Sequence, residues 1–244
     1  LVIDGNEDVY LTGEFGDTVD FDPGTGISNM TSAGWKDVFV TKFEANGNFA
    51  WAKSMGGNGS TYSESLLLDQ QGNIYVADQY NNRVRKITAN GMVSTLAGGG
   101  YYHSGHKDGP ASTSLFYNTY AVATDLSQNV YVFEGEGYNY IRKITPNGMV
   151  TTLMGPNWPI GSPDLFRGKA LATDKAGNLF FSVPEGIIKY TPDGKIVRYA
   201  MGGIGEVDGP SQIATYRAIN GIAADNLGNL YITDNNRIRK IAWR

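Results

Sequence analysis

The chain has 244 residues, a net charge of −4, no cysteine, 32 glycines and 15 tyrosines. The lack of cysteine excludes disulfides, zinc–thiolate sites and cysteine nucleophiles. The acidic balance gives no general attraction to nucleic acid or to an anionic membrane, and no apolar run is long enough to predict a membrane span. Abundant glycine and tyrosine suit an all-β chain with many turns.

The first 57 residues predict four strands, with the sequences LVID, DVYLTGEF, DVFVTKFE and FAWAKSMG. A long insertion, residues 16–36, separates the second strand from the third. Within it, Asp17, Asp20 and Asp22 superficially resemble a calcium-binding loop. The glutamate that ends an EF-hand loop is missing, so we expect a strand–turn insertion and no cofactor, with calcium as the alternative.

Residues 58–100 predict a second set of four strands, at positions 66–69, 73–78, 83–88 and 92–97. The dipeptide Asn90-Gly91 between the last two strands is the strongest short hairpin signal. It predicts a type I′ turn with a positive φ at Gly91.

Two turn signals recur along the chain, always in the same order. The first has the form Asp-x-x-x-Asn/Asp and begins at Asp4, Asp69, Asp125, Asp174 and Asp225; the second is Asn/Asp-Gly and begins at Asn46, Asn90, Asn147 and Asp193. A period of about 50 residues with four strands is typical of a propeller blade. The sequence therefore predicts an all-β fold, a single β-propeller domain over residues 1–244, with blades at about 1–57, 58–100, 101–155, 156–203 and 204–244.

The fifth blade is predicted to be incomplete. Residues 237–243 align with the third strand of the other blades, so the outer strand of this blade is missing. Two explanations stay open: the chain is a segment of a longer protein whose ring has a sixth blade, or five blades close imperfectly. We expect the segment, with an unpaired edge at residues 237–243 that favours association.

Two known repeat families resemble parts of the chain. Residues 1–57 resemble the bacterial SBBP propeller repeat, through the sequences YLTG, DFDPG, DVFV and WAK. Residues 58–244 resemble NHL repeats, through GNIYVADQYNNRVRKI, QNVYVFEGEGYNYIRKI and GNLYITDNNRIRKI, with residues 156–203 a degenerate copy. Mixed arrays of this kind resemble large secreted or surface proteins of bacteria, so the resemblance implies an extracellular or cell-surface location, with the periplasm as an alternative, and further domains in the same chain.

The loops differ between the two ends of the predicted blades. The first and third turns are short and nearly identical, whereas the second loops and the connectors between blades are long and dissimilar. Since repeat scaffolds usually carry function on variable loops, we expect a ligand site on this long-loop face. The candidate residues are aromatic side chains and the two histidines: Tyr101, Tyr102, His103, His106, Tyr138 and Trp158. Exposed tyrosine and tryptophan favour contact with a protein or a glycan.

Two further patterns are interpreted as structural. Asp78 with Arg83, and Asp234 with Arg237, bracket the second loop of two blades and are predicted to clasp it as ion pairs, with Glu134 and Tyr140 in their place in the third blade. The basic groups on the third strands are predicted to form a solvated outer edge rather than an RNA site: Arg83, Arg85, Lys86, Arg142, Lys143, Arg237, Arg239 and Lys240. The two histidines lack an evident third ligand, so no metal site is predicted.

No catalytic motif of the G-x-S-x-G, HExxH or phosphate-loop type occurs. The function predicted from the sequence is therefore a non-catalytic binding or scaffold module that contacts a protein or glycan, without nucleic-acid binding or membrane insertion. The alternative is a propeller hydrolase or lyase that uses channel carboxylates and a metal.

Overall fold

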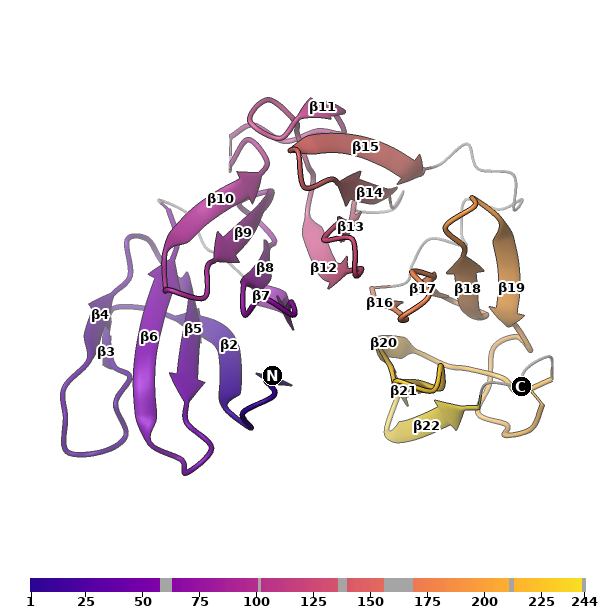
Figure 1. Ribbon diagram of the computed structural model, residues 1–244, viewed down its shortest axis with the longest axis horizontal. Helices are drawn as coiled ribbons and strands as arrows, with labels where there is room; N and C mark the ends of the chain where they lie inside the picture. Colours follow the sequence, from indigo (N-terminus) through magenta and orange to yellow (C-terminus); the bar gives the residue numbers. More distant parts are fainter. Residues whose placement is uncertain (58–62, 101, 136–139, 156–168, 211–212, 243–244) are drawn as a thin grey trace. The chain divides into compact units, whose positions relative to one another are not determined.

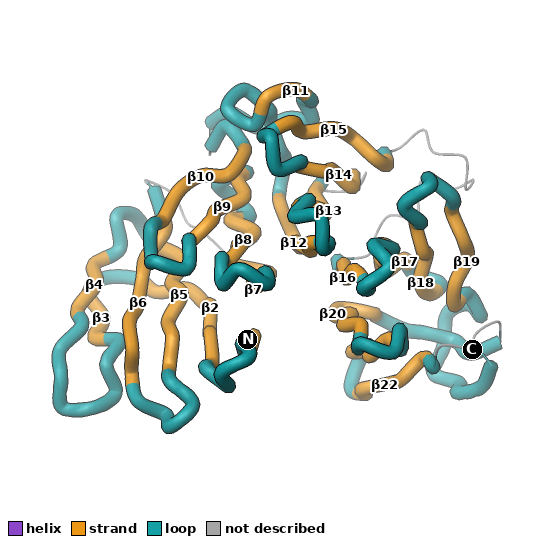
Figure 2. The backbone as a smooth tube through the Cα atoms, in the orientation of Figure 1, coloured by secondary structure: helices purple, strands orange, loops and turns teal. Residues whose placement is uncertain are grey.

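The computed structural model describes the chain apart from residues 58–62, 101, 136–139, 156–168, 211–212 and 243–244. The described residues form strands and turns and contain no helix (Figures 1 and 2). Accordingly, none of these residues belongs to a helix that could cross a membrane. The all-β prediction is confirmed.

Five antiparallel sheets follow one another along the chain as the blades of a β-propeller. Blade 1 has the order β1-β2-β5-β6, and its strands are β1 (Val2–Ile3), β2 (Val9–Phe15), β5 (Asp37–Phe43) and β6 (Phe49–Met55). Its insertion forms a separate hairpin of β3 (Thr18–Asp20) and β4 (Asn29–Thr31). Blade 2 consists of β7 (Ser63–Leu68), β8 (Ile74–Asp78), β9 (Arg83–Ile87) and β10 (Val93–Ala97).

The remaining three blades repeat this order. Blade 3 consists of β12 (Thr119–Thr124), β13 (Val130–Glu134), β14 (Tyr140–Ile144) and β15 (Met149–Met154), and the short β11 (Gly109–Pro110) pairs with β15. Blade 4 consists of β16 (Leu171–Thr173), β17 (Leu179–Val183), β18 (Gly186–Tyr190) and β19 (Ile196–Ala200). In blade 5 the described residues supply three strands, β20 (Ile219–Ala224), β21 (Leu230–Asp234) and β22 (Arg237–Ile241).

The chain divides into two compact units. Unit 1 comprises residues 1–120 and 147–150, and unit 2 comprises residues 121–146 and 151–244. Unit 1 has a core in which Val38 and Val40 of blade 1 pack with Ile74, Val76 and Ile87 of blade 2. These side chains occupy alternate positions of their strands, so each strand points one row of apolar side chains at the neighbouring blade.

Unit 2 has a core of the same kind. Phe180, Ile187 and Ala200 of blade 4 pack with Leu230 and Ile232 of blade 5. Burial of such faces supplies most of the stabilisation of a stacked blade, because one sheet alone leaves both of its apolar faces in water.

The Asn90-Gly91 turn differs from the predicted type. The φ of Gly91 is +84°, as expected, but Asn90 does not share the positive φ that a type I′ turn requires. Gly91 N donates to Thr88 O (2.7 Å) and Thr88 N donates to Met92 O (3.0 Å). This is a three-residue loop, a type I turn closed by a left-handed glycine in a G1 bulge, so the type I′ prediction was wrong.

The Asp-x-x-x-Asn/Asp turns have the same backbone form and a shared side-chain network. Asp69 Oδ1 accepts from the amides of Gln71 and Asn73, and Asp69 Oδ2 accepts from Asn73 Nδ2 and the Tyr75 hydroxyl. Asp4, Asp125, Asp174 and Asp225 accept amide bonds in the same way. A lysine of the adjacent strand lies over the aromatic ring that follows each turn, in the pairs Lys42–Tyr10, Lys86–Tyr75, Lys143–Tyr131, Lys189–Phe180 and Lys240–Tyr231.

Candidate functional site

Acid–arginine pairs mark the end of the second strand in three blades. The strand register places Asp78 opposite Arg83 and Asp234 opposite Arg237. The ion-pair partners lie two residues further along: Arg85 Nε is 4.0 Å from Asp78, and Arg239 Nη1 is 2.8 Å from Asp234. Residues two apart on a strand point to the same face, which explains how the second arginine reaches the carboxylate.

The third blade has the same pair, between Glu134 and Arg142. Both side chains are fully buried, and Tyr140, which the sequence suggested in place of an arginine, is the strand neighbour of Glu134 rather than its charge partner. The sequence did contain a signal for this pair, because Arg142 lies two residues after Tyr140, the residue opposite Glu134. In blade 4, Val183 and Ile188 stand at the corresponding positions.

The prediction of a solvated basic edge is wrong for three of its arginines, whereas Arg237 and Lys240 are exposed as predicted. Arg142 is fully buried, and the side chains of Arg85 and Arg239 are 15% and 8% exposed. Lys86, Lys143 and Lys240 lie over tyrosine rings. The buried arginines are paired with acids because a buried charge needs a partner, and the lysines make cation–π contacts.

Asp78 and Asp234 occupy the same blade position, but their pKa values are shifted in opposite directions. Burial raises the pKa of Asp78 to about 6, against hydrogen bonds from Asn81 and the field of Arg85 and Arg83. Burial also acts on Asp234, but the amides of Ala218 and Arg217 and the guanidinium of Arg239 outweigh it and hold the pKa of Asp234 below its ordinary value. The difference follows from geometry, since Asp234 accepts two backbone amides at 2.8 and 2.9 Å.

The second loop of blade 2 and the connector that follows blade 2 lie together within unit 1. Asn118 N donates to Asn82 Oδ1 (2.8 Å), and Arg83 Nη2 donates to Gly99 O (3.5 Å). The expected grouping of second loops with connectors therefore holds in this unit. Arg83 thus contacts the connector rather than Asp78. In the same way, Arg237 of blade 5 forms an ion pair with Glu206 (3.3 Å) of the corresponding connector in unit 2.

The two connectors share one backbone frame. In the first, Gly105 N donates to Phe116 O, Leu115 N to Lys107 O, and Ser114 N to Pro110 O. The equivalent bonds in the second run from Gly205 N to Tyr216 O, from Thr215 N to Val207 O, and from Ala214 N to Pro210 O. The same loop is thus built twice, and both copies contain the sequence Asp-Gly-Pro, at residues 108–110 and 208–210.

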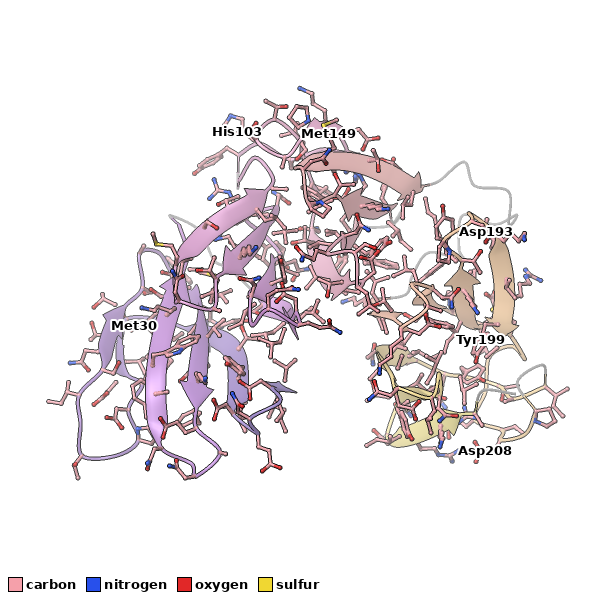
Figure 3. All side chains as sticks on the ribbon, viewed as in Figure 1. Met30, His103, Met149, Asp193, Tyr199 and Asp208 are labelled. Carbon is pink, nitrogen blue, oxygen red and sulfur yellow. The ribbon has the colours of Figure 1, made fainter. Side chains whose placement is uncertain are left out.

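The side chains on this frame differ. His106 meets Tyr117 edge to face, with ring centroids 6.1 Å apart, and the equivalent residues Glu206 and Arg217 form an ion pair of 3.4 Å. Tyr102 is 80% exposed, and His103 and His106 are exposed (Figure 3 labels His103). We refer to Tyr102, His103, His106 and Tyr117 as the connector surface. Tyr101, Tyr138 and Trp158 lie outside the described residues.

The insertion of blade 1 uses its carboxylates to hold its own backbone. Asp20 Oδ1 accepts from the amides of Asp22 and Ser28, and Asp22 Oδ1 accepts from Gly24 N. Over the part of the chain that the structure describes, no three His, Asp or Glu side chains are grouped as a metal site.

No family model matches the chain. A 64-residue stretch is 25% identical to an uncharacterized WD repeat-containing protein, L264, of Acanthamoeba polyphaga mimivirus, and covers 26% of this chain and 5% of that protein.

Solved structures share the fold over nearly the whole chain. A streptogramin B lyase (TM-score 0.54, 14% identity) matches 95% of this chain and 72% of its own. A structural genomics protein of unknown function from Bacteroides thetaiotaomicron (TM-score 0.59, 16% identity) matches 96% of this chain and 62% of its own. The extracellular domain of a candidate one-component system from B. thetaiotaomicron (TM-score 0.53, 15% identity) matches 89% of this chain and 28% of its own. A candidate gluconolactonase (TM-score 0.56, 12% identity) matches 98% of this chain and 78% of its own. At these identities the likeness shows the β-propeller fold, and it includes extracellular domains of bacterial proteins.

Proposed function

We propose that this chain is a non-catalytic binding module of a secreted or cell-surface bacterial protein, and that its connector surface contacts a protein or a glycan. The observation that carries the proposal is the pair of connectors with one backbone frame and different side chains. A fixed frame that displays exposed tyrosine and histidine in one copy and an ion pair in the other is how a repeat scaffold varies its contacts. The extracellular domains among the structural neighbours support the location.

Two repeat types are part of the same proposal. We assign blade 1 to the SBBP type and blades 2 to 5 to the NHL type. The β3–β4 hairpin between the second and third strands of blade 1 supports the distinction, because the corresponding loop in blade 2 spans residues 79–82.

The test is a binding screen of the intact protein against a glycan array and an array of bacterial surface-protein peptides. Tyr102→Ala combined with His103→Ala should lower binding to the ligand found by about tenfold or more, as expected for exposed aromatic anchors. Glu206→Ala with Arg217→Ala changes the other connector and serves as the matched control. Equal loss in both variants, or no loss in the first, would contradict a site on the connector surface.

The second candidate is a propeller hydrolase or lyase. It is favoured by the lyase and the candidate gluconolactonase among the structural neighbours. Metal analysis of the purified protein separates the two functions: a stoichiometric metal that is lost on substitution of carboxylates would support the enzyme, and metal-independent ligand binding would support the binding module.

A further inference from the structure

A pocket of about 330 Å³ lies between blades 3 and 4, within unit 2. Its walls come from the first turn and the third strand of each blade and from the outer strand of blade 3. Both blades have their fourth strands, β15 and β19, so the pocket lies between two complete blades. A pocket of this volume can hold one small molecule. The lining residues include Asp125, Tyr131, Lys143, Leu153, Lys175 and Tyr190.

Two of the lining residues depart from the repeat. Lys175 follows the aspartate of the first turn, and the same place in the other blades holds Gly5, Gln70, Leu126 and Asn226. Tyr190 stands near the end of the third strand, opposite Leu179, and the same place in the other blades holds Phe43, Ile87, Ile144 and Ile241. Both departures belong to blade 4 and face one pocket, so this pocket has a chemistry that the repeat does not supply elsewhere.

The acids in and beside the pocket are already bound within the protein. Asp125 accepts from Asn129 N (2.9 Å), from Asn129 Nδ2 (2.7 Å) and from the Tyr131 hydroxyl (2.9 Å). Burial raises the pKa of Tyr131, so its hydroxyl stays protonated and continues to donate to Asp125. Asp193, labelled in Figure 3 on the third turn of blade 4, forms an ion pair with Lys195 at 2.7 Å. These acids are therefore committed to other donors.

The two lysines of the pocket have no acid of their own. Within the described residues, neither Lys143 nor Lys175 forms an ion pair, and Lys143 lies over the Tyr131 ring at 5.9 Å. Two ammonium groups and one carboxylate, that of Asp125, line the pocket, so its charge is positive. A concave site with an excess of one charge attracts small ions of the opposite sign. The pocket is therefore suited to an anionic ligand.

The remaining wall is partly apolar and partly polar. Leu153 and Pro192 offer apolar surface, Ser127 has a hydroxyl, and Tyr190 has a half-buried ring with a hydroxyl at its tip. The C–H faces of a sugar ring pack against aromatic and apolar side chains, while its hydroxyls form hydrogen bonds with polar groups. A carboxylate on that ring would accept charge-assisted hydrogen bonds from the lysines.

We propose that this pocket binds a uronic acid, which is a sugar ring that carries a carboxylate. Lys143 and Lys175 hold the carboxylate, and Tyr190 packs against the ring. The pocket lies at the short-turn end of blades 3 and 4, and it is separate from the connector surface because none of the connector residues lines it. The two binding sites can therefore be tested independently.

The test is a titration of the intact protein with sodium glucuronate and with sodium galacturonate, followed by isothermal calorimetry and by amide NMR signals. We expect saturable binding of at least one of them, with shifted amide signals at Ser127, Ala176 and Gly177. Glucose, which lacks the charge, and inorganic phosphate, which lacks the ring, should each bind at least about tenfold more weakly. Added salt should weaken the binding of the uronate, because it screens the lysines.

Matched variants locate the site. Lys175→Gln and Tyr190→Ile introduce the residue types that blade 2 has at these places, so the fold should be kept while binding weakens by about fivefold or more. Lys143→Gln should weaken binding to a similar extent. Lys86→Gln is its control, because Lys86 lies over the Tyr75 ring of blade 2 in the same way, at 5.4 Å, and should leave binding unchanged.

Several outcomes would overturn the proposal. They are the absence of saturable binding for both uronates, an equal affinity for glucose or for phosphate, and unchanged affinity in Lys175→Gln and Tyr190→Ile. An equal loss in Lys86→Gln would also overturn it, since the effect would then not come from this pocket. Tyr102→Ala with His103→Ala should bind the uronate as the unchanged protein does; a loss there would place the uronate on the connector surface and refute the pocket.

Discussion

At the scale of single residues, two aspartates at the same blade position, Asp78 and Asp234, have pKa values shifted in opposite directions. Asp78 is buried with its arginine 4.0 Å away, whereas Asp234 has an arginine at 2.8 Å and two backbone amides. Hydrogen bonds to the charged form offset the cost of burial only in the second case. The two carboxylates should therefore affect the pH dependence of folding with opposite signs.

We predict that the variants Asp78→Asn and Asp234→Asn will change the pH dependence of stability in different pH ranges. Because the folded pKa of Asp78 is about 6, the native state holds a proton that the unfolded state has lost between about pH 4 and 6. Stability at this group therefore falls as pH rises through that window, by at most about 3 kcal/mol. Asp234 has a depressed pKa, so its contribution is present above the unfolded pKa and is lost as the pH falls through the folded value.

The measurement is the free energy of urea unfolding from pH 3 to 7. Asp78→Asn should remove the fall in unfolding free energy that accompanies a rise in pH from 4 to 6. Asp234→Asn should remove the fall in unfolding free energy that accompanies a drop in pH below about 4. If Asp78→Asn keeps the full slope between pH 4 and 6, the assigned direction for Asp78 is wrong.

The glycine of the G1 bulge gives a second prediction at this scale. An added Cβ at Gly91 would meet only Lys53 Cε at 3.6 Å, so any cost of Gly91→Ala comes from the φ of +84° and not from a clash. We expect a loss of about 1–2 kcal/mol in unfolding free energy. Gly5→Ala is the control, because Gly5 has open space and no positive φ; an equal effect at both sites would contradict the conformational explanation.

At the scale of the blade, one repeat replaces an ion pair with apolar residues. Blade 3 buries Glu134 with Arg142, whereas blade 4 has Val183 and Ile188 at the same two positions, exposed 3% and 2%. The fold therefore tolerates either solution, provided that both positions change together. Removal of one partner leaves a buried charge without its counter-ion.

We predict that Arg142→Ile alone will cost about 3–5 kcal/mol of stability. The double variant Glu134→Val with Arg142→Ile should recover most of that loss, because it reproduces the pair found in blade 4. Thermal or urea unfolding of the four proteins of this cycle gives the coupling energy. Additive losses in the double variant would show that Glu134 and Arg142 act independently.

At the scale of the whole molecule, charge placement argues against nucleic-acid binding. The net charge is −4, and several basic residues of the third strands contact an acid or an aromatic ring, as Arg142, Arg239, Lys86 and Lys240 do. Binding to phosphate backbones needs several accessible cations that release counter-ions. We therefore predict no complex with structured or random RNA in a low-salt gel shift at micromolar protein. A salt-sensitive complex that weakens with Arg83→Ala and Lys86→Ala would refute this.

The sequence by itself determined the local structure of the blades. Turn residues at repeated spacing predicted the strands and their order, including the three strands of the fifth blade that the structure describes, because turn chemistry acts between near neighbours. The positive φ of Gly91 followed from the same local rule, although the turn type did not, since a three-residue loop and a two-residue loop share the Asn-Gly signal.

Only the tertiary structure decided which side chains meet. Asp78 and Asp234 were expected to pair with the nearest arginine across the loop, but in the folded chain the arginine two residues on forms the ion pair. The opposite pKa shifts of these carboxylates and the burial of Arg142 depend on the contacts that surround each side chain in the folded chain. Such contacts join residues far apart in the sequence, and no local pattern records how deeply a blade face is covered.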